Sequence, residues 1–173
     1  LSYTIDFPDD EKEKSIYSFA ISKKSYQFIR QSINDQTFDD LKTVYTSVST
    51  SDFLNEGIQK FSAYCRSAHQ LYVQLIFPFK TLIGEKRITV IPDGYLCYLP
   101  FEALLTEKVA PATSIHYHDL PYLILNNTVN YSYSAELFMT DVPRKLFSIN
   151  KALAFAPSYP EFSVIKNDTV HLP

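Results

Sequence analysis

The stretch of sequence that decides the fold is Ile88–Leu104, which reads ITVIPDGYLCYLPFEAL. It opens with an uninterrupted apolar and β-branched run, which is typical of a strand buried on both faces in a parallel sheet. Pro92–Gly94 supplies the residue types that a tight turn requires, so we expect the strand to end there. Pro100 suits the first turn of a short helix, where no amide hydrogen is needed, and Glu102 favours the positive end of that helix.

Two further strands are expected downstream of this stretch. Thr128–Tyr133 and Ala152–Ala156 have the apolar and aromatic content of strands, and Ser134 between them is placed to cap a helix that runs through Met139. Because strand, helix and strand follow one another, parallel pairing is predicted.

The first thirty residues predict an antiparallel sheet instead. Tyr3–Phe7, Ile16–Ile21 and Tyr26–Ile29 show the alternation of β-branched and aromatic residues that favours strands. Ser22–Lys24 is short enough for a tight hairpin, and the charged segment Pro8–Lys14 forms the other break. An antiparallel front sheet is therefore expected ahead of the parallel one.

A long helix is predicted between these two regions. Its apolar residues recur at spacings of four and three and so lie on one helical stripe; they are Leu54, Ile58, Phe61, Cys65, Ala68, Tyr72 and Leu75. The polar residues Ser49–Asp52 offer capping oxygens at its start, and Pro78 should end it. A shorter helix, Asp39–Val48, is expected before it.

The composition limits the classes of function. With 173 residues, 46% of them hydrophobic and 20% charged, the chain is predicted to form one folding unit with a real core. A net charge of -3 offers no basic surface for a phosphate backbone, so nucleic acid is not expected as a partner. No apolar run approaches the ~18 residues of a membrane-spanning helix. Cys65 and Cys97 lie in apolar surroundings without disulfide spacing, which indicates a reducing, cytoplasmic location.

The stretch Ile88–Leu104 resembles the signature of the CHAT domain, with a strand, a Pro-Asp-Gly turn, a leucine and then Leu-Pro-Phe-Glu-Ala-Leu. Further matches follow in order at Tyr122–Ile124, Tyr131–Ser134 and Ala152–Pro157. Upstream, Tyr17–Ile29 and the long helix resemble the lead-in seen when such domains follow tetratricopeptide repeats. The resemblance covers most of the chain.

This resemblance implies an α/β fold, a caspase-like three-layer sandwich with a mainly parallel sheet. Residues 1–80 would be its antiparallel hairpin region and helical lead-in, and residues 81–173 the first half of its core. The chain opens at Leu1 and ends at Pro173 without a recognisable element end. We therefore expect the fold to be incomplete at its C-terminus.

Domains of this family are similar to caspases, separases and gingipain-type peptidases, in which a thiolate attacks a peptide carbonyl and a histidine manages protons. The family's histidine lies in an H-x-x-x-H-G-like segment after the third strand, and its cysteine ends a strand that reads like L-S-A-C. Neither segment occurs before Pro173, so no catalytic residue and no cofactor is assigned, and the question of enzymatic activity stays open.

Two hypotheses about function follow. In the first, the chain is the N-terminal part of a CHAT-type cysteine peptidase domain whose intact parent cleaves a protein. In the second, it is a non-enzymatic docking module for proteins such as tetratricopeptide repeats, which its 13 tyrosines favour because tyrosine is common at binding surfaces. A small-molecule site at the carboxyl ends of the parallel strands is a third possibility by analogy of fold.

The expected partners are proteins: upstream repeats, the missing half of the domain, or a second copy of the chain. A parallel sheet that stops after its third strand leaves an unpaired edge, and unpaired edges invite association. We expect the isolated chain to dimerise or aggregate unless the missing half is supplied.

Residues with reactive side chains have structural interpretations that we prefer. Cys65 lies on the apolar stripe and Cys97 lies between Leu96 and Tyr98, so both are predicted to be core residues. Ser134 lacks the glycines of a nucleophile elbow and is interpreted as an N-cap. Asp93 is interpreted as a turn residue and Glu102 as a carboxylate at a helix start. With only 3 glycines, the chain has no phosphate-cradling loop.

Two histidines and an aspartate are candidate metal ligands. His116, His118 and Asp119 alternate along an extended segment, so two of them point the same way. Nearby prolines indicate a surface loop, and no further ligand is evident, so a solvated loop is the preferred interpretation. His69 in the long helix and His171 in a frayed end are assigned no role.

Overall fold

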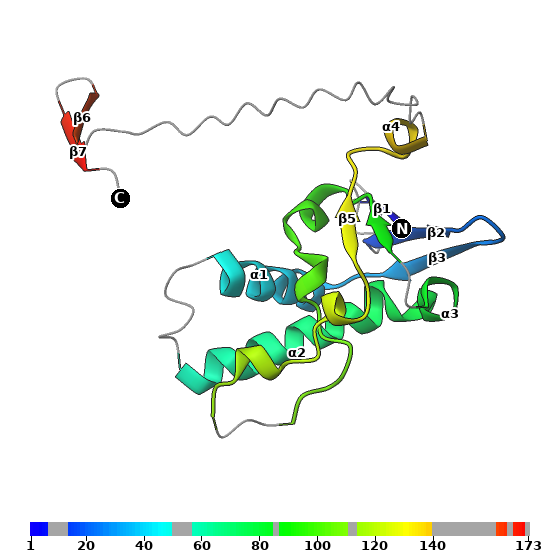
Figure 1. Ribbon diagram of the computed structural model, residues 1–173, viewed down its shortest axis with the longest axis horizontal. Helices are drawn as coiled ribbons and strands as arrows, with labels where there is room; N and C mark the ends of the chain where they lie inside the picture. Colours follow the sequence, from blue (N-terminus) through cyan, green and yellow to red (C-terminus); the bar gives the residue numbers. More distant parts are fainter. Residues whose placement is uncertain are drawn as a thin grey trace, which may run out of the picture. The chain divides into compact units, whose positions relative to one another are not determined.

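The computed structural model describes residues 1–6, 14–49, 57–84, 87–110 and 114–139 in full, and the backbone of two strands further on, Phe162–Ile165 and Asp168–His171. The chain divides into two compact units, Leu1–Thr140 and Asp141–Pro173 (Figure 1). Among the described residues the fold is mixed α/β, as predicted, with both an antiparallel and a parallel sheet. None of the described helices is long and apolar enough to cross a membrane.

The predicted antiparallel sheet is present and consists of β1 (Ser2–Asp6), β2 (Ser15–Ile21) and β3 (Tyr26–Ser32). The hairpin between β2 and β3 closes where expected, because the Ser22 amide donates a hydrogen bond to the Ser25 carbonyl at 2.8 Å. Side chains alternate between the faces of the sheet, and Ile16 and Ala20 are fully buried on the inner one.

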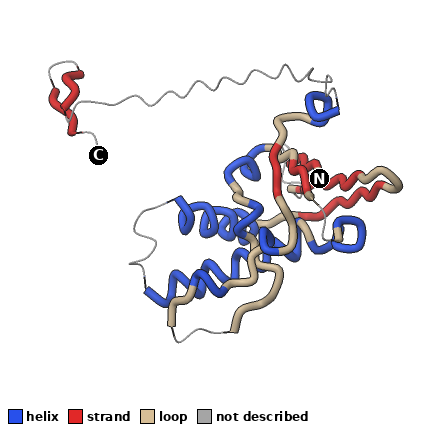
Figure 2. Tube along the Cα trace, viewed as in Figure 1, coloured by secondary structure: helices blue, strands red, loops and turns tan. Residues whose placement is uncertain are grey.

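Helix α1 (Asp35–Ser49) and helix α2 (Gly57–Leu75) pack against each other (Figure 2). Helix α1 is longer than the predicted Asp39–Val48, because Asn34 caps it: the Thr37 amide donates to the Asn34 side-chain oxygen at 3.1 Å. Helix α2 ends before Pro78 as predicted. Pro78 lies in the 3₁₀ turn η2 (Phe77–Phe79), which leads into α3 (Lys80–Ile83).

Most of the predicted stripe of α2 is buried, although Ile58 is only half-buried, and the buried face is wider than the stripe. Residues of the predicted pattern that are buried are Phe61, Cys65, Ala68, Tyr72 and Leu75, and they are joined by Tyr64, Ser67 and Leu71. Leu54 and the capping residues from Thr50 on lie outside the described residues. The Ser67 hydroxyl donates to the buried carboxylate of Asp40 at 2.7 Å, so the interface between the two helices contains a satisfied polar pair.

The predicted parallel pair is also present, formed by β4 (Ile88–Val90) and β5 (Val129–Tyr131). Ile88 and Val90 are buried on one face of β4, whereas Thr89 and Ile91 on the other are only half-buried. The prediction of burial on both faces is therefore wrong for the second face, because the packed core lies on one side of this strand.

The two sheets meet at β1 and β4, which the sequence pattern did not predict. The Tyr3 amide donates to the Ile91 carbonyl at 3.0 Å, and the Ile91 amide donates to the Leu1 carbonyl at 2.8 Å. The N-terminal ammonium group donates to the Thr89 carbonyl at 2.7 Å. The antiparallel hairpin region is thus joined edge to edge to the parallel pair.

After β4 the chain forms two 3₁₀ turns, η3 (Gly94–Tyr98) and η4 (Phe101–Ala103), where a short helix was predicted. Pro100 precedes η4 rather than occupying its first turn. Gly94 has a φ of 54°, in the left-handed region that a residue with a side chain rarely adopts, so the Pro-Asp-Gly turn depends on this glycine.

The described part continues through η5 (Tyr117–Asp119) and η6 (Leu123–Leu125) to β5 and then α4 (Ala135–Met139). The predicted N-cap is confirmed, because the Leu137 amide donates to the Ser134 hydroxyl at 3.0 Å.

The second unit contains an antiparallel pair of strands, β6 (Phe162–Ile165) and β7 (Asp168–His171). The prediction that His171 belongs to a frayed end is wrong, because it pairs with Phe162 in this hairpin. Ala152–Ala156, predicted as the third parallel strand, lies outside the described residues.

Candidate functional site

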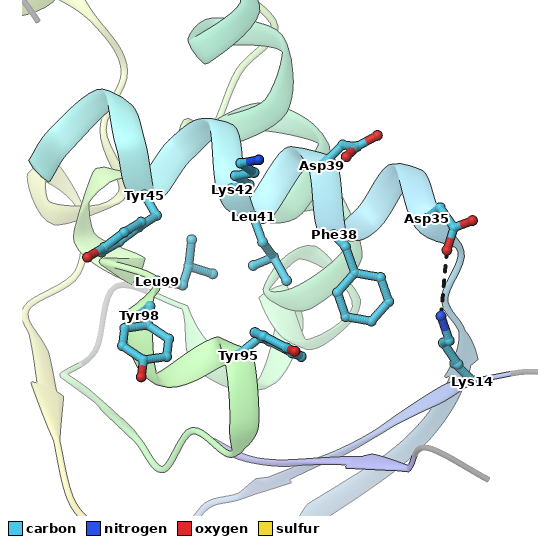
Figure 3. A pocket seen from close by; sticks show the side chains of 10 residues that line it. All are labelled: Lys14, Asp35, Phe38, Asp39, Leu41, Lys42, Tyr45, Tyr95, Tyr98 and Leu99. Atoms are coloured by element: carbon cyan, nitrogen blue, oxygen red, sulfur yellow. Dashed lines mark ion pairs between the residues drawn. The ribbon is translucent and has the colours of Figure 1, made fainter. Parts of the chain in front are cut away.

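A groove of about 790 Å³ opens between α1 and the turn η3 (Figure 3). Its lining, which we call the aromatic groove, consists of Lys14, Asp35, Phe38, Asp39, Leu41, Lys42, Tyr45, Tyr95, Tyr98 and Leu99. Neither Cys65 nor any histidine lines it. Its lining among the described residues is aromatic, aliphatic and charged.

Two aromatic pairs span the groove, each joining α1 to η3. The Phe38 and Tyr95 rings meet edge to face at 5.7 Å, and the Tyr45 and Tyr98 rings do so at 5.8 Å. This is a preferred geometry for aromatic pairs. Figure 3 shows the two pairs at opposite ends, with Leu41 and Leu99 between them.

Helical geometry sets the spacing of these pairs. Phe38 and Tyr45 are seven residues apart on α1, which at a rise of about 1.5 Å per residue separates them by about 10 Å. Tyr45, Tyr95 and Tyr98 are 44%, 58% and 63% exposed, so their rings remain accessible to a ligand.

Charges of both signs line the groove. At one end Lys14 Nζ lies 3.6 Å from Asp35 Oδ1 and 5.1 Å from the centre of the Phe38 ring. Asp39 and Lys42 are exposed on α1 and form no ion pair with any described residue. One carboxylate and one ammonium group are therefore available to a ligand.

The two cysteines occupy different environments. Cys65 is a core residue as predicted, 5% exposed, and burial raises the pKa of its thiol to about 11. Its sulfur is therefore protonated near neutral pH and is a poor nucleophile. The prediction that Cys97 is a core residue is wrong: it is exposed, because the tight turn η3 buries Leu96 and directs the next residue outward.

His69 lies one helical turn after Cys65, and both line a second groove of about 720 Å³. The imidazole Nδ1 lies 3.1 Å from the Leu105 carbonyl, however, and no hydrogen bond joins it to the sulfur in the described part of the chain. Cys65 and His69 are spaced as a nucleophile and its base could be, but the sulfur makes no hydrogen bond to the imidazole and is not ionised near neutral pH.

The structure brings His116, His118 and Asp119 together in and beside η5. Their potential ligand atoms lie within 4.8 Å of one another, and all three residues are exposed. His118 Nε2 lies 3.1 Å from Asp119 Oδ1. The exposure agrees with the preferred interpretation as a solvated loop, and no fourth His, Cys or carboxylate of the described residues joins the cluster.

The Leu-Pro-Phe-Glu-Ala-Leu segment is held by tyrosine hydroxyls, and its side chains Leu99, Phe101 and Leu104 are buried. The Tyr64 hydroxyl donates to the Ala103 carbonyl at 2.7 Å, and the Phe101 amide donates to the Tyr131 hydroxyl at 2.8 Å. The Tyr131 hydroxyl in turn donates to the Glu102 carboxylate. Burial, and then the adjacent carboxylate, raise the pKa of Tyr131.

Asp93 and Glu102, the two acidic candidates, therefore have structural roles. The Asp93 carboxylate accepts a hydrogen bond from the Ile5 amide at 3.3 Å, so it ties the Pro-Asp-Gly turn to β1. Glu102 lies in the first turn of η4, as expected of a helix-start carboxylate, and also accepts the Tyr131 hydroxyl.

Comparisons of the chain with family models, with curated proteins and with solved structures found no match.

Proposed function

We propose that this chain is the opening part of a caspase-like α/β domain of the CHAT type and that it acts as a protein-binding module through the aromatic groove. The order of elements supports the class: an antiparallel hairpin, a long helix, a parallel strand pair, and a Leu-Pro-Phe-Glu-Ala-Leu segment in the core between the strands of that pair. In this proposal the remainder of the three-layer sandwich lies beyond the described core.

Binding rather than cleavage is the function proposed for the described residues. Cys65 is protonated and buried, and the exposed Cys97 has no hydrogen bond to a histidine. The peptidase hypothesis then requires a cysteine and a histidine from elsewhere in a parent protein. Both cysteines are free thiols, which fits the cytoplasmic location that we propose.

The ligand that best fits the groove is an extended, proline-rich segment of a partner protein. A polyproline II helix repeats every three residues, or about 9 Å, and the two aromatic pairs are about 10 Å apart along α1. Successive turns of such a segment would each meet one pair. Aromatic-lined grooves are a recurrent means of binding this conformation.

Polar groups of the groove complement the same ligand. A polyproline II backbone has no internal hydrogen bonds, so its carbonyls are free to accept from the hydroxyls of Tyr45 and Tyr98. Asp39 attracts a basic residue beside the prolines of the ligand, and Lys42 attracts an acidic one. These two opposite charges set the direction in which the bound segment runs.

The single observation that carries the proposal is the pair of edge-to-face aromatic contacts between α1 and η3. We would titrate labelled oligoproline, and a glycine-serine peptide of equal length, with the full chain and follow fluorescence anisotropy. We expect a Kd on the order of tens to hundreds of micromolar for oligoproline alone.

Tyr45→Ser and Tyr98→Ser should each weaken this binding about tenfold, because each removes half of an aromatic pair. Tyr26→Ser is the matched control, since Tyr26 is 81% exposed on β3 and does not line the groove. Equal binding of both peptides, or groove variants that bind like the control, would contradict the groove as the site.

The family assignment has a separate test. The coding sequence of the parent protein, read on from Pro173, should encode a histidine-glycine segment and then a strand that ends in cysteine if the parent is a peptidase. Continuation without either would exclude the peptidase hypothesis and leave the docking module.

A further inference from the structure

The outer face of the β2–β3 hairpin is apolar and exposed. Phe19 pairs with Phe28 across the strands, with ring centres 4.7 Å apart, and Ile21 pairs with Tyr26. These four side chains, which we call the hairpin face, are 41%, 48%, 69% and 81% exposed in that order. Figure 1 shows the hairpin extending beyond β1.

The opposite face of the same strands is already covered. Ile16 and Ala20 are fully buried there, and the Gln27 side chain donates to the Pro78 carbonyl at 3.2 Å. An antiparallel sheet with one face in the core ordinarily presents polar residues on the other. The aromatic content of the hairpin face is therefore the mark of an interaction surface.

The exposed apolar area of the hairpin face is large enough to form the centre of a protein interface. Aromatic side chains bury about 150–250 Å² each, so the exposed fractions of the hairpin face, with Ile21 taken at the lower value, amount to roughly 350–550 Å². The largest apolar patch on a typical monomer is of this size, about 300–600 Å², and is often functional. Stable complexes bury about 800 Å² on each partner, so this patch would supply an apolar centre and its surroundings a polar rim.

Charged side chains lie at the two ends of this surface. Lys23 and Lys24 occupy the turn of the hairpin. At the other end Asp6 pairs with Ser15, whose hydroxyl accepts a hydrogen bond from Arg30 Nε at 3.2 Å, so this end carries both signs. Asp6 and both lysines are exposed and form no ion pair with a described residue. A two-fold axis across the strands would place the lysines of one copy opposite Asp6 of the other.

We infer that the hairpin face binds the hairpin face of a second copy of this chain, sheet on sheet, with the strands of the two copies running in opposite directions. A two-fold contact requires a self-complementary surface. The aromatic centre can pack on its own copy, and this orientation places the turn lysines beside Asp6 and keeps them apart from the lysines of the other copy. The inference is independent of the proposed function, because it uses neither the aromatic groove nor the edge of the parallel sheet.

The first test is sedimentation equilibrium of the full chain from low to high micromolar concentration. We expect a reversible dimer, and we expect Phe28→Ser and Tyr26→Ser to raise its dissociation constant at least about tenfold each. Tyr98→Ser, in the aromatic groove, is the matched control and should leave the dimer unchanged. A wild-type chain that remains monomeric would overturn the inference, as would a dimer that persists in both hairpin variants.

Charge reversal tests the orientation. Asp6→Lys and the double change Lys23→Glu, Lys24→Glu should each weaken the dimer about twofold to fivefold, and combining all three changes should restore it. If the strands instead ran in the same direction, lysine would face lysine, and the double change would place glutamate opposite glutamate, so like charges would still face each other and the dimer would be unchanged. That result would overturn the proposed arrangement. Circular dichroism of each variant separates loss of association from loss of fold.

Discussion

Tyrosines occur in two contrasting regions of this molecule. Tyr3 and Tyr64 in the core, and Tyr131 on β5, which is 46% exposed, each donate a hydroxyl hydrogen bond. Two of these bonds hold the segment Leu99–Leu104 through a carbonyl or a carboxylate. In the aromatic groove, Tyr45 and Tyr98 have exposed rings and no hydroxyl hydrogen bond within the described residues. The contrast teaches that tyrosine content alone does not indicate binding. The hydrogen-bond partner of the hydroxyl distinguishes structural tyrosines from those available to a ligand, because Tyr131 and Tyr45 are about equally exposed.

The largest effect that would test this contrast is expected at Phe101. Its side chain is fully buried and stacks on Tyr3 with ring centres 5.5 Å apart. Phe101→Ala should lower the free energy of unfolding by about 3–5 kcal/mol, because it leaves a cavity at the centre of the core. Urea denaturation measures the loss. A cost below about 1 kcal/mol would mean that this segment is not part of a packed core.

A smaller loss is expected when only a buried hydroxyl is removed. The Tyr3 hydroxyl is buried and donates to the Leu75 carbonyl at 2.8 Å. Tyr3→Phe should therefore reduce stability by about 1–3 kcal/mol, since it leaves that acceptor without its partner. The same change at the exposed Tyr98 should alter stability by less than about 0.5 kcal/mol. Equal effects at the two positions would remove the distinction between core and groove.

Burial of Cys65 makes the stability of the fold depend on pH. The pKa of Cys65 is raised to about 11 by burial, so the folded protein holds this proton more tightly than the unfolded chain. The resulting stability is complete below the ordinary thiol pKa and is lost as the pH rises toward 11. The buried tyrosines contribute in the same direction only above pH 10, their ordinary pKa.

Stability measured by urea denaturation should therefore begin to fall between pH 9 and pH 10 in the wild type. Cys65→Ala should flatten the profile in that window, because it removes the buried thiol. A slope that survives in Cys65→Ala would show that another group titrates there.

Periodic patterns in the sequence predicted the elements that depend on local signals. The alternation in Ile16–Ile21 and Tyr26–Ile29 predicted a hairpin, and the spacing from Phe61 to Leu75 predicted α2. The start of α1 at Asn34 also had a local signal, an N-cap residue three positions before Thr37, which the prediction from Asp39 overlooked.

Contacts between distant segments could not be predicted in this way. The aromatic groove joins Phe38 and Tyr45 to Tyr95 and Tyr98 across some fifty residues of chain, and no periodicity within either segment specifies the other. The junction of Ser2 with Ile91 is of the same kind. Cys97 was placed wrongly because its apolar neighbours suggested burial, whereas the geometry of a 3₁₀ turn decides which of them faces inward.

The smallest effect concerns the charge beside Tyr131, a structural tyrosine on β5. Desolvation is the first cause of the raised pKa of Tyr131, and the hydrogen bond and charge of Glu102 add to it. Glu102→Gln keeps an acceptor for the hydroxyl but removes the negative charge, so phenolate formation at Tyr131 should shift to lower pH while remaining above the ordinary range. Absorbance titration measures the shift, and Tyr131→Phe identifies which transition belongs to this residue. An unchanged titration would assign the whole perturbation to burial, and Glu102 would then have no electrostatic influence on the core that distinguishes this tyrosine from those of the groove.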